Sequence, residues 1–123
     1  MKSTIKLSSL VLSLLICFSI AKSHAQSSSE YHKQADEKDQ KGKFRAAIKL
    51  YQKALDLDPN NVEILEKIVY AKSNTGQYGS AIDNLNTLIQ LKPKSSKFHF
   101  IRGFFQSNLK NYTDSNSFAA LEY

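Results

Sequence analysis

The sequence predicts an all-α fold in which antiparallel helix pairs repeat along the chain, and three observations support it. Apolar residues recur at steps of three and four, which places them on one face of a helix. Two stretches that lie 34 residues apart share their pattern of apolar, glycine and proline positions. Glycine or proline stands where the apolar runs stop, as is typical of short helices joined by tight turns.

The first 25 residues are typical of an export signal rather than of a folded element. Lys2 and Lys6 precede an apolar run over residues 7–20, and small residues follow at Ser23 and Ala25. This pattern predicts a secretory signal peptide, residues 1–25, cleaved after Ala25. As a helix the run would reach roughly 21 Å, short of the roughly 30 Å of a bilayer core. An uncleaved anchor is therefore the weaker alternative, and we expect no stable membrane span in a mature chain that is periplasmic or secreted.

The helices of the first two copies follow from their apolar faces. In each copy the helix after the glycine carries apolar residues at helical spacing, as does the helix that precedes Gly76. These residues are Phe44, Ala47, Ile48, Tyr51 and Leu55, then Tyr78, Ala81, Ile82, Leu85, Leu88 and Ile89, and upstream Val62, Leu65, Ile68 and Val69.

The turns follow from glycine and proline. Gly42 and Gly76 are expected to end the first helix of each copy in the left-handed conformation that glycine tolerates. Pro59 and Pro93 are expected to follow the end of each second helix, because proline cannot continue one. The unit is therefore helix, tight turn, helix, tight turn.

A third copy is weaker. Tyr112 lies 34 residues after Tyr78, but Lys110 occupies the glycine position and Ser115 the alanine position. We therefore expect the second helix of this copy to be polar and poorly patterned.

These residues give the chain its resemblance to the tetratricopeptide repeat (TPR) family. The positions that carry it are Gly42, Phe44, Ala47, Tyr51, Ala54 and Pro59, then Gly76, Tyr78, Ala81, Leu85 and Pro93, and in the third copy Gly103, Tyr112 and Phe118. The resemblance implies a short right-handed superhelix of about two and a half repeats over residues 28–123. The repeats would be 28–61, 62–95 and a partial 96–123.

The resemblance also implies a concave groove, lined by the first helix of each repeat, that takes a peptide or a partner protein. By register its residues would be His32, Lys33, Asp36, Gln40, Glu66, Lys67, Tyr70, Asn74, Lys97, Phe100, Ile101, Phe104 and Asn108. The side-chain amides of Asn74 and Asn108 suit a bridged peptide backbone. The simpler alternative is that all of these are ordinary solvated helix residues.

Composition and spacing argue against catalysis, metal binding and nucleic-acid binding. Of the chain's net charge of +6, three lysines belong to residues 1–25, and the remaining +3 is dispersed rather than clustered as a nucleic-acid surface requires. Cys17, the one cysteine, lies in the predicted signal peptide, so a mature chain has no thiol for a disulfide or a metal. His32 and His99 lie far apart, and the acidic cluster around Asp36 suits lysine pairing one helical turn away. We therefore expect no enzyme and no cofactor.

The aromatic residues of the third copy, Phe98, Phe100, Phe104 and Phe105, are too many for one short helix pair to bury. We therefore expect the carboxyl end to recruit a partner or a second copy. The function predicted is a non-catalytic protein–protein interaction module. The alternatives are a structural or assembly subunit that uses its carboxyl-terminal helices, and a part of a longer TPR array.

Overall fold

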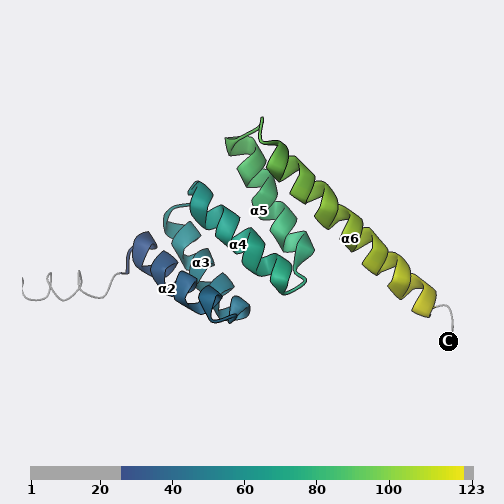
Figure 1. Cartoon of the computed structure of the whole chain (residues 1–123), viewed down its shortest axis with the longest axis horizontal. Coiled ribbons are helices and arrows are strands. Elements are labelled where there is room, and N and C mark those ends of the chain that lie inside the picture. The colour runs from purple at the N-terminus through teal and green to yellow at the C-terminus, as the bar shows by residue number, and fades with distance from the viewer. Residues whose placement is uncertain (1–25, 121–123) are drawn as a thin grey trace, which may run out of the picture.

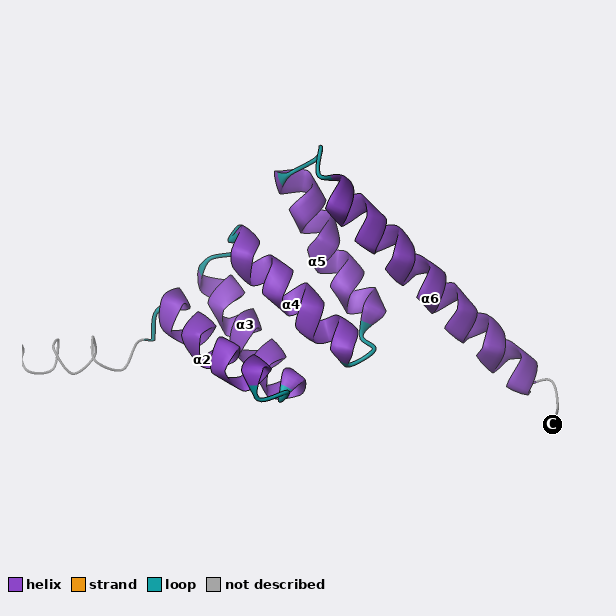
Figure 2. Ribbon diagram, in the orientation of Figure 1, coloured by secondary structure: helices purple, strands orange, loops and turns teal. Residues whose placement is uncertain are grey.

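The computed structural model describes residues 26–120, with side chains described as far as residue 116. Within that part the chain forms five helices and no strand (Figures 1 and 2). They are α2 (Ser28–Gln40), α3 (Phe44–Leu57), α4 (Val62–Asn74), α5 (Tyr78–Leu91) and α6 (Ser96–Ala120). The all-α prediction is confirmed, whereas the predicted signal peptide and Leu121–Tyr123 lie outside the described residues.

Two helices begin at side chains that cap free backbone N–H groups. The Ser27 hydroxyl accepts a hydrogen bond from the Glu30 backbone N–H, and the Glu30 carboxylate accepts one from the Ser27 backbone N–H. This reciprocal capping box starts α2. The Asn61 side chain likewise accepts from the Ile64 backbone N–H and starts α4.

Gly42 and Gly76 make the turns within the helix pairs, as their spacing predicts. Their φ angles are +70° and +73°, in the left-handed region that favours glycine. The N–H of Gly42 bonds to the Asp39 carbonyl and that of Lys43 to the Lys38 carbonyl. In the second pair the N–H of Gly76 bonds to the Ser73 carbonyl and that of Gln77 to the Lys72 carbonyl. This is the Schellman arrangement, which satisfies the last carbonyls of α2 and α4.

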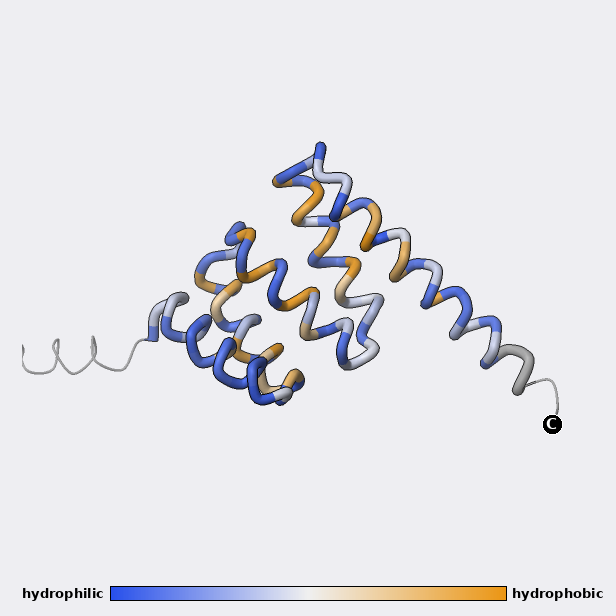
Figure 3. The backbone as a smooth tube through the Cα atoms, viewed as in Figure 1, coloured by the Kyte–Doolittle hydropathy of each residue, from blue (hydrophilic) through white to orange (hydrophobic). Residues whose placement is uncertain are grey.

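The core lies between helices that are neighbours in sequence. α2 packs on α3, α3 on α4, α4 on α5 and α5 on α6. Ala47 and Ala81 are completely buried, which lets the paired helices approach closely. α2 is hydrophilic along most of its length, whereas α3 to α5 carry the apolar faces (Figure 3). The buried residues are Ala35, Ala47, Tyr51, Ala54, Leu55, Ile64, Leu65, Ile68, Val69, Ala71, Ala81, Leu85, Leu88, Phe98 and Phe105.

The third copy is one continuous helix over the described residues, not a helix pair. α6 runs through Lys110, the position at which the two preceding copies have Gly42 and Gly76. A lysine in the left-handed conformation would cost about 1–2 kcal/mol, so the chain continues as a helix instead. Its distal part extends beyond the end of α5 and away from the other helices (Figure 1).

The face of α6 that a paired helix would cover gives a second reason why the third copy is not a helix pair. In α4 that face presents Leu65 and Ile68, whereas the residues 34 positions later are His99 and Arg102. Arg102 instead donates to the Asn86 side-chain oxygen of α5. A returning helix would therefore find little apolar surface to bury on α6.

Candidate partner-binding groove

A polar network joins α2, α3 and α4. The completely buried Tyr51 donates its hydroxyl hydrogen to Asp36 Oδ1 over 2.6 Å, and Lys67 Nζ lies 3.3 Å from the same oxygen. His32 Nε2 lies 3.6 Å from the other Asp36 oxygen. Burial, and then the hydrogen bond to Asp36, raise the pKa of Tyr51 far above its usual range. The network therefore holds a neutral phenol between the first helices of two successive repeats.

Asp39 lies three residues after Asp36, on the side of α2 that faces α4. Its Oδ1 atom is shielded from solvent and has no hydrogen-bond partner among the described residues. Burial raises the pKa of Asp39, Lys67 opposes that shift, and Asp36 adds to it. Asp39 is therefore an acceptor whose bonding capacity the fold leaves unused.

A groove is lined by residues of α4, α5 and α6, with Asp39 of α2 at one edge. Its cavity volume is about 810 Å³. The floor is apolar and is made by Val69, Leu85, Leu88, Phe98, Ile101 and Phe105. The rim is mostly polar and comprises Asp39, Val62, Glu63, Glu66, Lys67, Tyr70, Ser73 and Lys97. Apolar floors with a few oriented polar groups are typical of binding sites.

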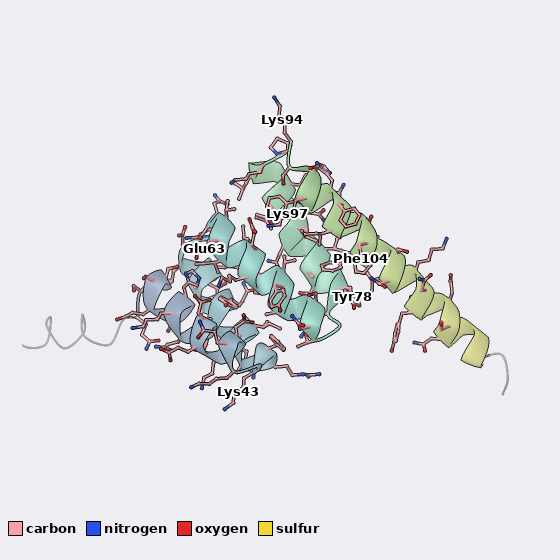
Figure 4. All side chains as sticks on the ribbon, in the orientation of Figure 1. Lys43, Glu63, Tyr78, Lys94, Lys97 and Phe104 are labelled. Atoms are coloured by element: carbon pink, nitrogen blue, oxygen red, sulfur yellow. The ribbon has the colours of Figure 1, made fainter. Side chains whose placement is uncertain are left out.

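An ion pair crosses the groove at the start of α6. Lys97 Nζ lies 2.6 Å from Glu66 Oε2, which ties α6 to α4 near the surface. Figure 4 labels Lys97, Glu63 at the start of α4, and Phe104 further along α6. Because Lys97 and Glu66 are both substantially exposed, we expect the pair to contribute no more than about 1 kcal/mol.

Five of the predicted groove residues meet here. The cavity is lined by Glu66, Lys67, Tyr70, Lys97 and Ile101. Asp36 does not line it but forms an ion pair with Lys67. The structure brings these residues together, although their role in binding stays a prediction.

This cavity is not lined by the remaining predicted residues, which are His32, Lys33, Gln40, Asn74, Phe100, Phe104 and Asn108. Lys33 lies exposed on α2. Asn74 donates its amide to the Tyr70 carbonyl, and Asn108 donates to the Phe104 carbonyl, each over 3.0 Å. The two amides therefore share an environment, as their 34-residue spacing suggests, but they bond to their own helices. Phe104 is 57% exposed on α6.

Several lining residues were not among the predicted groove residues. Asp39, Glu63 and Ser73 each lie three or four residues from a predicted one, so helical spacing could have found them. Leu85 and Leu88 belong to α5, and the sequence assigned them only to the packed face. The sequence could not show that these fully buried residues lie beneath a groove between α4 and α6.

A buried lysine lies outside the groove, between α4 and α5. Lys72 is 6% exposed, and its Nζ donates to Asn84 Oδ1 over 2.6 Å and to the Ser80 carbonyl over 3.4 Å. Burial lowers the pKa of Lys72, and Asp83 partly opposes the shift. Because its bonds stay within one helix pair, we assign Lys72 to packing.

Two searches of the described residues gave negative results. No helix between residues 26 and 120 combines the length and hydropathy needed to cross a membrane. Across the same residues, histidine, cysteine, aspartate and glutamate side chains form no group of three that could hold a metal ion.

The fold and its groove define a helical-repeat protein of the TPR type, and comparison with known proteins agrees. The TPR-repeat family model matches residues 36–73, so the chain contains a TPR repeat. The chain is similar to the crystal structure of MamA protein, with 33% sequence identity and a TM-score of 0.62. That similarity covers 67% of this chain and 45% of the MamA chain, so this chain spans less than half of MamA. Comparison with curated proteins gives no match.

Proposed function

We propose that this chain is an exported, non-catalytic adaptor that holds a partner polypeptide in the groove between α4 and α6. The observation that carries the proposal is the cavity of about 810 Å³, with its apolar floor and polar rim. TPR-type helical repeats are interaction modules, and the present chain has both a TPR repeat and that fold. The place of action would be the cell envelope or the extracellular space.

The floor and the rim would contribute to recognition in different ways. A partner side chain the size of leucine or phenylalanine would contribute about 1.5–3 kcal/mol when it leaves water for the floor. The exposed phenol of Tyr70 and the charges of Glu63, Glu66 and Lys97 surround that floor. Such rim groups restrict which partner sequences fit more than they add affinity.

The chemistry of the described residues favours binding over turnover. Asp36, Tyr51 and Lys67, which could move protons, bond to one another. Tyr51 is completely buried and cannot reach a substrate. We therefore assign this network to positioning α2 against α4.

Affinity capture from the native cells tests the groove. The variant Tyr70→Glu places a charge at the rim, and Leu57→Glu is its matched control, because both residues are 58% exposed and Leu57 does not line the cavity. We expect the wild type and Leu57→Glu to capture the same partner and Tyr70→Glu to lose it. Equal capture by all three chains would contradict use of the groove.

The mass of the purified chain tests export. Removal of residues 1–25 would leave a chain that begins at Gln26, which intact mass spectrometry identifies directly. We expect this species in the envelope or culture fluid. A full-length chain found in the cytoplasm would refute the location and leave the groove proposal standing.

A further inference from the structure

We infer that the occupant of the groove is α6 of a second copy of this chain, so that two copies pair with each other. This inference rests on the proposed groove and names its partner. The evidence is an exposed aromatic pair on α6, a difference in charge between α6 and the groove, and the fact that the aromatic pair and part of the groove lining lie on the same helix.

The aromatic pair is formed by Phe100 and Phe104. Phe100 is 75% exposed and Phe104 is 57% exposed. Their spacing of four residues places them side by side on one face of α6. Ring pairs this exposed are costly to leave in water, and they are the side chains that most often anchor an interface.

The charges of α6 complement those of the groove. From Ser96 to Tyr112 the helix carries Lys97, Arg102 and Lys110 and no carboxylate. In the groove, Lys97 pairs with Glu66 and Lys67 with Asp36. The carboxylates of Asp39 and Glu63 are left without a lysine or arginine ion-pair partner among the described residues.

The exposed Glu63 would favour a basic helix as the occupant. Its Oε1 lies 4.0 Å from His32 Nε2 and it remains largely exposed, whereas the free Oδ1 of Asp39 is shielded from solvent, so Glu63 is the carboxylate that an incoming base can reach. Arg102 and Lys110 of a second copy carry the opposite charge, and complementary charge steers association and fixes register.

Symmetry makes the pairing self-consistent. The groove is lined by Lys97, Phe98, Ile101 and Phe105 of α6, so the acceptor surface and the aromatic pair lie along the same helix. A two-fold arrangement therefore lets each copy place Phe100 and Phe104 in the groove of the other. Insertion of both pairs would bury on the order of 1,000 Å² in total, near the lower limit of specific interfaces. The expected product is a concentration-dependent dimer.

Sedimentation velocity and light scattering of the purified full chain test the pairing. We expect the mass to rise from one chain to two with concentration, and more readily at low salt. The double variant Phe100→Ser with Phe104→Ser should raise the dimer Kd by about tenfold or more. Leu57→Ser, an equally exposed apolar residue on α3, should leave the Kd unchanged. A wild-type chain that stays monomeric at all concentrations would overturn the inference.

A disulfide test shows whether α6 enters the groove. With Cys17→Ser as background, Ser73→Cys places a thiol on the groove rim and Ser107→Cys places one beside Phe104 on α6. Mixing the two chains under mild oxidation should link them, whereas a control pair of Ser73→Cys and Gln52→Cys should not link. A dimer without the Ser73–Ser107 link would overturn the groove as the site of pairing.

The two proposals fail in different ways. If the chain is monomeric but Tyr70→Glu loses a captured partner, the second copy is the wrong occupant and the groove function stands. If the chain pairs but Tyr70→Glu neither weakens pairing nor changes capture, the groove itself is the wrong site for both.

Discussion

Removal of the Tyr51 hydroxyl tests whether the polar network stabilises the fold. Tyr51→Phe keeps the ring in its buried place and deletes only the 2.6 Å hydrogen bond to Asp36. A hydrogen bond to a charged group contributes about 1.5–3 kcal/mol. Asp36 is partly exposed and keeps Lys67 at 3.3 Å, so we expect a smaller loss, about 1–2 kcal/mol at neutral pH. Urea unfolding followed by far-ultraviolet circular dichroism measures it.

The pH dependence of the same variant is the sharper test. Burial raises the pKa of Tyr51 in the folded chain above the ordinary value of 10.0. Above that ordinary value the unfolded phenol ionises and the folded one does not, so the wild type loses about 1.4 kcal/mol of stability per pH unit. Tyr51→Phe has no such loss, and its stability should equal that of the wild type roughly one pH unit above the ordinary value.

Tyr112→Phe is the control, because Tyr112 is exposed on α6. We expect this control to match the wild type at every pH. If Tyr51→Phe is as stable as the wild type at neutral pH, or if their difference stays constant through the alkaline range, the phenol does not hold the network.

Four further substitutions have expected outcomes, each measured by urea unfolding. Gly76→Ala forces alanine into φ +73° and should lower the free energy of unfolding by about 1–2 kcal/mol. Gly103→Ala, on an open face of α6, should raise it by about 0.5–1 kcal/mol. Equal effects of the two substitutions would contradict the argument that Gly76 is needed for the turn. Ala81→Leu should cost about 1–3 kcal/mol by overpacking a fully buried position, and an unchanged free energy of unfolding would refute the predicted crossing of the paired helices. Because burial lowers the folded pKa of Lys72, the stability of the wild type relative to Lys72→Met should increase as pH approaches 10.5. A difference between the two chains that stays constant with pH would show that Lys72 makes no such contribution.

The helix pairs could be predicted because the information for them is local. Gly42 and Gly76 determine where the chain reverses, and their positive φ angles confirm the reason. Pro59 and Pro93 follow helices that end at Leu57 and Leu91, as proline requires. Each of these signals depends on residues within a few positions of the turn.

The groove was predicted only in part because it depends on how separate helices lie. The register placed Lys67, Tyr70 and Lys97 on the binding side, and all three line the cavity. The apolar floor depends on the angle at which α6 leaves α5, for which no single stretch of sequence carries a signal. Asp39 illustrates the same limit, because the shielding of its unused oxygen depends on how neighbouring helices surround the end of α2.

The residue after each first helix also decides the outline of the molecule. Where glycine stands, the chain doubles back and adds thickness to the stack. Where Lys110 stands, it runs straight on and adds roughly 16 Å of reach beyond that point. The residue at the turn position and the polar face of α6 together separate a compact hairpin from an extended helix, and a repeat array can thus change its outline at one edge while its interior stays the same.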